Sequence, residues 1–236
     1  MMLEIGYNHS FEVRREQYHS PCSDNFSVLY ISDLHLNGFC NNLVTRIGEA
    51  IIALNPTIIL LGGDYVDSRK GLGHLNDLLS MISGRDHVFA IAGNHDYFFG
   101  IDAIKAVMTE HHVAWIENKS THFMYNNTSI RIDGTSIGDA ASDAGFSILV
   151  LHKPISIDRF HSRYNLAFAG HLHGCQFVFW QSENKLYPGR FFYKWNILET
   201  QHNSCKYYIS KGMGDTLPVR YNCKRDLLFI EVQSTI

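Results

Sequence analysis

The first half of the chain alternates short apolar runs with longer amphipathic stretches. Short runs of consecutive apolar residues are typical of buried strands. We expect such strands at 27–32, 57–61 and 87–92. Apolar residues recur at helical spacing between and after these runs. We expect helices at 41–54, 74–83 and 101–111. A strand followed by a helix, three times in succession, predicts βαβ units and a parallel sheet.

The second half has a different pattern. Residues 121–133 alternate between apolar and polar side chains, and Asn126-Asn127 in the middle predicts the turn of a β-hairpin. A short helix is expected at 155–162. Further strands are expected at 147–151, 166–169, 176–180, 206–210 and 227–233. We find no internal repeat and no low-complexity linker, so we expect one domain over residues 1–236 that contains two packed sheets.

Two segments allow more than one interpretation. Residues 1–26 are polar and weakly patterned, which fits an N-terminal arm or a first edge hairpin. Residues 177–195 hold eight aromatic side chains, and we favour a hairpin that packs into the core of the second sheet. The alternative is that the wider segment 176–205 forms a cap or hairpin lip. Lys185, Arg190 and Lys194 would then place an apolar lip against an anionic membrane or acyl chains.

Composition excludes several classes of protein. The chain has 236 residues, of which 45% are apolar and 18% charged, so it is neither disordered nor fibrous. Its net charge of −3 gives no strong basic field, which makes nucleic acid an unlikely partner. Five cysteines without a CxxC pair predict no disulfide framework and favour the cytoplasm. Residues 1–17 lack the apolar region of a signal peptide, and Asn55 and Pro56 interrupt the longest apolar stretch.

Polar side chains follow the ends of the predicted strands in both halves of the chain. These residues are Asp33, Asp64, Asn94, His152 and His171, with His35, His95 and His173 close behind them. Ligands of open α/β sheets bind outside the carboxyl ends of the strands, so we expect these side chains to converge. Oxygen and imidazole ligands suit Mn²⁺, Fe²⁺, Zn²⁺ or Mg²⁺. Any one of these residues alone would be read as a cap or a satisfied polar group.

The motifs DLH, GGDYVD, GNHD, LHKP and GHLHG occur in this order between residues 33 and 174. In this series the chain resembles the calcineurin-like metallophosphoesterases. The segment SKGMGDTLPVR at 210–220 is similar to a bacterial branch that includes membrane-associated phosphodiesterases and UDP-2,3-diacylglucosamine pyrophosphohydrolases. That branch usually has a second glycine where this chain has Cys175, and many members carry an N-terminal membrane helix that this chain lacks. The resemblance implies a four-layer α/β/β/α sandwich of two mixed sheets.

The resemblance also implies a role for each matching residue. Two divalent metal ions are expected, with manganese favoured and zinc, iron or magnesium as alternatives. One ion would take Asp33, His35 and His173, and the other would take Asn94, His152 and His171. Asp64 would bridge the two ions. His95 would stand beside the phosphate, oriented by Asp67, whereas Asp96 is expected to hold the GNHD turn. Arg220 is expected to contact substrate.

The function implied is metal-dependent hydrolysis of phosphodiester or pyrophosphate bonds by a metal-bridging hydroxide. The substrate would be a phosphate-containing small molecule or a lipid-linked nucleotide, with UDP-2,3-diacylglucosamine as the most concrete candidate. The alternatives within this fold are a phosphomonoesterase and a nuclease. Alternatives of other classes are a non-catalytic protein-interaction scaffold and a membrane-surface binding module. We expect the protein in the cytoplasm, with peripheral contact to the inner membrane as a further option.

Overall fold

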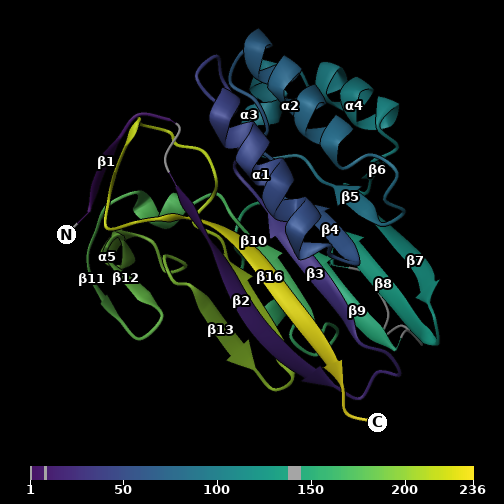
Figure 1. The fold of residues 1–236 in the computed structure, drawn as a ribbon. Helices are drawn as coiled ribbons and strands as arrows, with labels where there is room; N and C mark the ends of the chain where they lie inside the picture. Colours follow the sequence, from purple (N-terminus) through teal and green to yellow (C-terminus); the bar gives the residue numbers. More distant parts are fainter. Residues whose placement is uncertain (1, 8–9, 138–144) are drawn as a thin grey trace.

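Two six-stranded sheets pack face to face in the computed structural model, which describes residues 2–7, 10–137 and 145–236 (Figure 1). The strands of the first sheet, in spatial order, are β2 (Phe11–Ser20), β16 (Arg225–Ser234), β3 (Phe26–Ile31), β4 (Ile58–Leu61), β5 (Val88–Ala90) and β6 (Ala114–Trp115). Those of the second are β13 (Glu199–His202), β14 (Cys205–Ile209), β10 (Leu166–Ala169), β9 (Phe146–Val150), β8 (Thr128–Gly134) and β7 (Lys119–Tyr125). Both sheets contain parallel and antiparallel pairs, so the expected mixed-sheet α/β class is confirmed.

Helices cover the outer face of the first sheet, as Figure 1 shows. They are α1 (Asn41–Leu54), α2 (Arg69–Met81) and α4 (Ile101–Glu110), and the short α3 (Asn94–Phe99) lies directly before α4. The apolar face of α1, with Leu43, Ile47 and Ile51, is buried against the sheet. Helix α1 ends where Asn55 adopts the left-handed conformation and Pro56 follows. The expected helix at 41–54 is therefore confirmed at both ends.

The main core lies between the two sheets. Successive side chains of a strand point to opposite faces. In β3, Val28 and Tyr30 therefore face the second sheet, whereas Leu29 and Ile31 pack under the helices. Strands buried on both faces need apolar residues at every position, which explains the uninterrupted apolar runs. The hairpin of β7 and β8 turns at Asn126-Asn127, as predicted.

The outer face of the second sheet differs from the expectation. Its buried residues pack against Phe160 and Tyr164, which follow a 3₁₀ turn, and against Trp195 from a turn much later in the chain. The helix expected at 155–162 is a single 3₁₀ turn at Ile157–Arg159. Within the described residues, turns and loops thus form the fourth layer.

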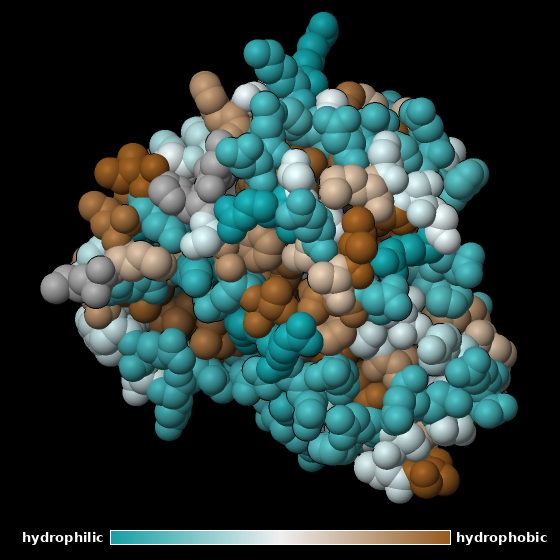
Figure 2. Space-filling model, in the orientation of Figure 1, coloured by the Kyte–Doolittle hydropathy of each residue, from teal (hydrophilic) through white to brown (hydrophobic). Residues whose placement is uncertain are grey.

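The N-terminal segment does not form the hairpin that was one interpretation of residues 1–26. Strand β2 pairs in parallel with β16, and β1 (Leu3–Ile5) pairs antiparallel with β15 (Val219–Tyr221). Both partners lie more than two hundred residues away, so no local pattern could reveal them. Figure 2 shows apolar side chains exposed over β1, where Leu3 and Ile5 lie.

The aromatic segment is a separate surface element, so the interpretation favoured from the sequence is wrong. Strands β11 (Val178–Ser182) and β12 (Lys185–Pro188) form their own two-stranded sheet, followed by α5 (Gly189–Phe192). Within the described residues, Val178 and Leu186 of this hairpin are buried and pack with Cys223. Five of its aromatic side chains are exposed: Phe179, Trp180, Phe191, Phe192 and Tyr193. No helix in the described part of the chain is long and apolar enough to cross a membrane.

Candidate metal centre

The predicted ligand residues meet at one edge of the two sheets. Asp33 follows β3, Asp64 follows β4, and Asn94 begins α3 after β5. From the second sheet, His152 follows β9 and His171 follows β10. The parallel strands end at the same edge, so residues more than a hundred positions apart become neighbours. Most of these side chains are buried, whereas Asn94, His95 and His171 are partly exposed.

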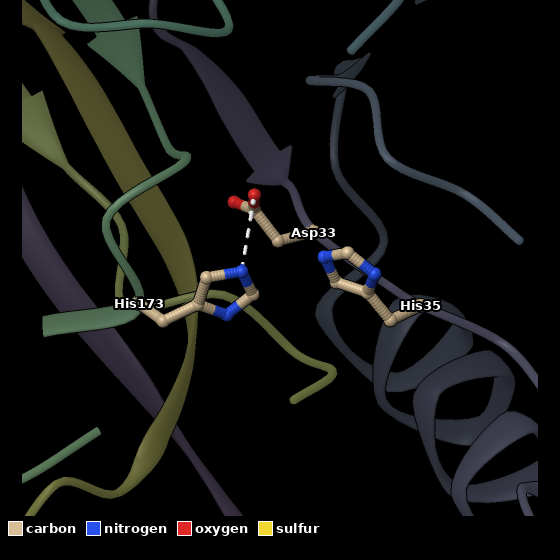
Figure 3. A group of neighbouring side chains, drawn as sticks. All are labelled: Asp33, His35 and His173. Carbon is tan, nitrogen blue, oxygen red and sulfur yellow. Dashed lines mark ion pairs between the residues drawn. The ribbon is translucent and has the colours of Figure 1, made fainter. Parts of the chain in front are cut away.

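Asp33, His35 and His173 form the first cluster (Figure 3). One ligand atom from each residue lies within 4.8 Å of the other two. His173 Nε2 is 3.6 Å from Asp33 Oδ1. Figure 3 shows Asp33 and His35 on the segment after β3, with His173 facing them from a separate loop. This cluster matches the first predicted ligand set.

Asp64, His152 and His171 form the second cluster. His152 Nε2 lies 3.1 Å from Asn94 Oδ1 and 3.2 Å from His171 Nδ1. Asp64 Oδ2 is 3.2 Å from His152 Nε2 and 3.7 Å from His35 Nε2, so this member of the second cluster also lies beside the first. The structure therefore places Asp64 where a bridging ligand is expected and brings Asn94 to the second cluster.

Hydrogen bonds outside the clusters orient three of the imidazole rings. His152 Nδ1 lies 2.9 Å from Gly62 O, and His173 Nδ1 lies 3.2 Å from Gly214 O. His35 Nδ1 lies 2.9 Å from Asp67 Oδ1. Each acceptor requires the proton on Nδ1, which leaves a lone pair on Nε2 directed inward. Ligating histidines are commonly fixed in this way.

A divalent cation fits the donors that meet here. His35 Nε2 is buried and has no hydrogen-bond partner among the described residues. Leaving such a buried polar atom unpaired costs about 1–3 kcal/mol. A cation would accept this lone pair and would also offset the charges of Asp33 and Asp64. The donor set contains carboxylate, amide and imidazole atoms and no thiolate, which suits manganese, iron, zinc or magnesium.

Charge and burial set the protonation of the ligands. Burial lowers the pKa of His173 to about 4, so this ring is neutral at pH 7 and can bind a metal. Burial alone would raise the pKa of Asp64, but the hydrogen bond and charge of His152 outweigh it and lower that pKa. Asp64 is therefore ionised. Burial alone would lower the pKa of His152, but the hydrogen bond and charge of Asp64 raise it to about 9. A metal ion that binds here would therefore displace a proton from His152 Nε2.

Close backbone packing gives the clusters their shape. Asp33 and Asp64 both adopt positive φ angles, of 54° and 56°. Such angles are uncommon for residues other than glycine and tend to occur at functional sites. A Cβ added to Gly93 would lie 2.1 Å from Asp64 Oδ1, and one added to Gly170 would lie 2.2 Å from Asp33 Oδ2. These glycines are therefore required for the backbone to approach the carboxylates.

Asp96 connects the loops after β4 and β5. Its carboxylate accepts hydrogen bonds from the backbone N–H groups of Asp64, Tyr65 and Gly93. Burial raises the pKa of Asp96 to about 6, even though these hydrogen bonds act in the opposite direction. The expectation that Asp96 holds the GNHD turn is met, and its contacts also reach the GGD loop.

Asp67 has a different main contact from the one expected. Its carboxylate is 2.9 Å from His35 Nδ1, whereas its distance to His95 Nδ1 is 3.7 Å. Asp67 thus orients a predicted metal ligand more directly than it orients His95. The His95 side chain is 41% exposed and lies at the rim, with its ring 4.7 Å from that of His35.

Arg220 does not face the site, which corrects its assignment as a substrate contact. Its side chain is fully buried, and Nε donates to Asp215 Oδ1 at 2.5 Å. A guanidinium enclosed in this way cannot reach a phosphate. The sequence did not predict that the carbonyl groups of Gly62 and Gly214 orient the rings of His152 and His173. Only the position of Gly62 in GGDYVD and of Gly214 in the 210–220 motif hinted at a role.

The chain is similar to known proteins in sequence and in fold. Residues 26–175 match the family model of the calcineurin-like phosphoesterases. The chain is 28% identical to phosphodiesterase YaeI of Escherichia coli K12, over 88% of this chain and 82% of that protein. Among solved structures, the calcineurin-like phosphoesterase YfkN of Bacillus subtilis superposes with a TM-score of 0.51 at 13% identity, covering 80% of this chain and 82% of that one.

The NAD nucleotidase of Haemophilus influenzae has the same core fold, with a TM-score of 0.52 and 12% identity. The match covers 81% of this chain but only 46% of the nucleotidase, so its likeness concerns the fold alone. The family model spans well over half of the chain and contains all five motifs. The residues matched by the family model include every residue of the two clusters. The chain therefore belongs to the calcineurin-like phosphoesterase family and is a phosphoesterase.

Proposed function

We propose that this protein hydrolyses phosphodiester or pyrophosphate bonds with the help of two divalent metal ions, and that both ions are manganese. One observation carries the proposal: Asp64 belongs to the second cluster, and its carboxylate also lies 3.7 Å from Nε2 of His35 in the first. Metal ions held there would activate a water near neutral pH and stabilise charge on the phosphoryl oxygens. Asp33, His35 and His173 would hold one ion. Asn94, His152 and His171 would hold the other, and Asp64 would contact both.

His95 is the residue best placed for proton transfer. It lies at the rim beside the first cluster, 41% exposed, and its Nδ1 is 3.7 Å from Asp67 Oδ1. His35, Asp67 and His95 also lie close enough to one another to hold an ion, so the metal content of a His95 variant tests the role predicted for His95. From this position it would donate a proton to the leaving oxygen or stabilise the charge that develops there. Positioned acids and bases of this kind contribute about 10²–10⁴-fold to a rate.

Two adjoining hollows support a substrate with two substituents on phosphorus. One has a volume of about 390 Å³ and is lined by residues that include His171, His173 and Tyr193. The other has a volume of about 490 Å³ and is lined by residues that include His35, His95 and Phe98. Thr216 lines both. A diester centred on the clusters could place one arm in each hollow, whereas a monoester would use only one.

The exposed aromatic residues support an amphiphilic substrate. Tyr193 lines one hollow, and the exposed Trp180 and Phe191 pack together beyond it. UDP-2,3-diacylglucosamine remains the specific candidate, with its pyrophosphate at the clusters and its acyl chains against this surface. Arg190 and Lys194, on the same segment, would favour contact with an anionic membrane. Such contact would place the protein at the inner surface of the cytoplasmic membrane.

Hydrolysis assays with defined substrates test the proposal. Purified protein supplied with Mn²⁺ should cleave bis(p-nitrophenyl) phosphate faster than p-nitrophenyl phosphate, and it should release UMP from UDP-2,3-diacylglucosamine. Asp64→Asn should be inactive, whereas Asp102→Asn, the same change at an exposed position on α4, should retain full activity. Faster cleavage of the monoester would indicate a phosphomonoesterase. Cleavage of single-stranded DNA or RNA alone would indicate a nuclease.

Two further results would reject parts of the proposal. Absence of turnover on every substrate, with metal bound below one ion per chain, would favour a non-catalytic scaffold. Absence of UMP release, with diester hydrolysis retained, would discard the acylated nucleotide and leave the metal centre standing. Flotation with vesicles of anionic phospholipid tests the membrane contact, and protein that stays at the bottom of the gradient would reject it.

A further inference from the structure

Arg220 is a charged side chain that the interior encloses completely. Its Nη2 donates to Gly214 O at 2.6 Å, and its Nη1 donates to Cys223 O at 3.3 Å. Its charge is balanced by Asp215. Burying an ion pair costs several kcal/mol per ion in desolvation, and well-packed apolar residues are often at least as stable. Stability alone therefore gives little reason for an arginine at this position.

Arg220 binds a backbone segment that also contacts the residues of the first cluster. Gly214 O accepts from Arg220 and lies 3.2 Å from Nδ1 of His173. The N–H of the same residue donates to Asp33 O at 2.6 Å. A Cβ on Gly214 would lie 2.6 Å from the Cβ of His35, so the backbone here lies directly against that ligand. One glycine thus contacts all three residues of the first cluster.

A second connection runs through Cys223. Arg220 donates to its carbonyl oxygen, and Cys223 Sγ donates to the carbonyl oxygen of His173 at 3.3 Å. Arg220 therefore constrains His173 from two sides, at the ring and at the backbone. His173 has a φ of 51°. Positive φ angles are uncommon for residues other than glycine, so the surroundings of His173 must hold its backbone in this conformation.

We propose that Arg220 is a positioning residue for the metal ion held by Asp33, His35 and His173. It acts through Gly214 and Cys223, and it touches neither metal nor substrate. The planar guanidinium holds Gly214 O at a fixed point, which keeps the His173 proton on Nδ1 and directs Nε2 toward Asp33. The inference rests on the proposed metal centre and adds a specific dependence of one metal site on this residue.

Arg225 provides a matched control within the same network. It is as deeply buried as Arg220 and pairs with the other oxygen of Asp215. Its other hydrogen bonds, within the described residues, go to Glu4 and Gly6 on the N-terminal side. The same substitution at the two arginines therefore disturbs the same ion network, but only the change at Arg220 acts on Gly214.

The test compares Mn²⁺ binding by metal-depleted wild type, Arg220→Lys and Arg225→Lys. Calorimetric titration of wild type should resolve two sites. Arg220→Lys should weaken one site by about 10–100-fold, the usual effect of losing a group that orients a ligand, and leave the other within about threefold. Arg225→Lys should retain the wild-type affinity of both sites, even if its unfolding temperature falls as far as that of Arg220→Lys. Equal affinities in wild type and Arg220→Lys, or equal weakening by both variants, would overturn the inference.

A second measurement does not depend on the folding of a variant. Guanidinium N–H exchange can be followed by NMR in the wild-type protein, with and without Mg²⁺ as a diamagnetic ion. Exchange at Arg220 should slow on metal addition, whereas exchange at Arg225 should stay unchanged. No slowing at Arg220 would overturn the inference. Wild type that binds no metal would overturn the proposed function as well, so the two failures can be distinguished.

Discussion

The Asp64 carboxylate lies 3.2 Å from Nε2 of His152. Asp64 follows β4 of the first sheet, and His152 follows β9 of the second. The contact therefore joins the two sheets at the edge where the ligand clusters meet. Because each sheet supplies part of the centre, the packing of the sheets determines the distances between its ligands.

His95→Ala should separate metal binding from the rate of hydrolysis. We expect both ions to remain bound and kcat to fall by about 10²–10⁴-fold, since a positioned proton donor is lost while every proposed ligand stays. Metal content by elemental analysis, measured beside turnover of a diester, checks this. His122→Ala, at an exposed position on β7, is the control and should match wild type. Loss of one ion from His95→Ala would mean that His95 is itself a ligand.

Asp67→Asn should act through His35. Its carboxylate is closer to His35 than to His95, so we expect the affinity for one ion to fall by about 10–100-fold. At saturating metal, kcat should recover to within about tenfold of wild type. If the metal affinity stays unchanged and kcat falls as far as it does in His95→Ala, Asp67 orients His95 instead of His35.

Metal removal should lower thermal stability. A ligand at one hundred times its Kd stabilises the folded state by about 2.7 kcal/mol, and each kcal/mol corresponds to about 2–4 °C for a domain of this size. Treatment with EDTA should therefore lower Tm by about 5–10 °C, and Mn²⁺ should restore it. Scanning calorimetry of the depleted and reloaded protein measures the difference. An unchanged Tm would indicate that the folded protein binds no metal under these conditions.

Asp133 predicts a stability effect that depends on pH. Burial would raise its pKa, but hydrogen bonds from Arg131, Ser120 and Tyr164 outweigh burial and lower it. A lowered pKa stabilises the fold above the ordinary carboxyl value of about 3.9, and this contribution disappears as pH falls through the folded value. Asp133→Asn should cost about 3 kcal/mol at pH 7, because Arg131 loses its buried partner.

Urea unfolding at several pH values checks the Asp133 prediction. The difference in unfolding free energy between wild type and Asp133→Asn should stay constant from pH 7 to pH 5 and shrink below about pH 4. Asp158→Asn, at an exposed aspartate, should stay within about 0.5 kcal/mol of wild type. If the difference in unfolding free energy does not change with pH, the charge of Asp133 does not contribute to the stability of the fold.

The place where the candidate ligands meet could be predicted because they lie within a few residues of the end of an apolar run. Asp33 and Asp64 come shortly after β3 and β4, whose residues are almost all buried, so the apolar pattern gives both the strand and the position of the candidate ligand. Helix α1 was predictable for a similar reason, since its apolar stripe and Asn55-Pro56 are local features.

Other features depend on contacts that no local pattern encodes. From the sequence, Arg220 could be a surface residue or a phosphate-binding residue. In the structure it is buried and donates hydrogen bonds to Asp215 and Gly214. The hairpin of β11 and β12 is rich in aromatic residues, as a core hairpin would be, but its buried residues Val178 and Leu186 pack, within the described residues, with Cys223 and Leu198. The pairing of β2 with β16 joins the two ends of the chain. These relationships follow from tertiary packing, which the spacing of residues along the chain does not specify.

Calorimetric titration of metal-depleted protein with Mn²⁺ tests most directly whether Asp64 joins two metal sites. Wild type should bind two ions per chain, and Asp64→Asn should weaken both by at least about a hundredfold, since loss of a ligand costs more than loss of a group that orients one. Asp102→Asn should bind as wild type does. Two sites of unchanged affinity in Asp64→Asn, or fewer than two sites in wild type, would contradict the account.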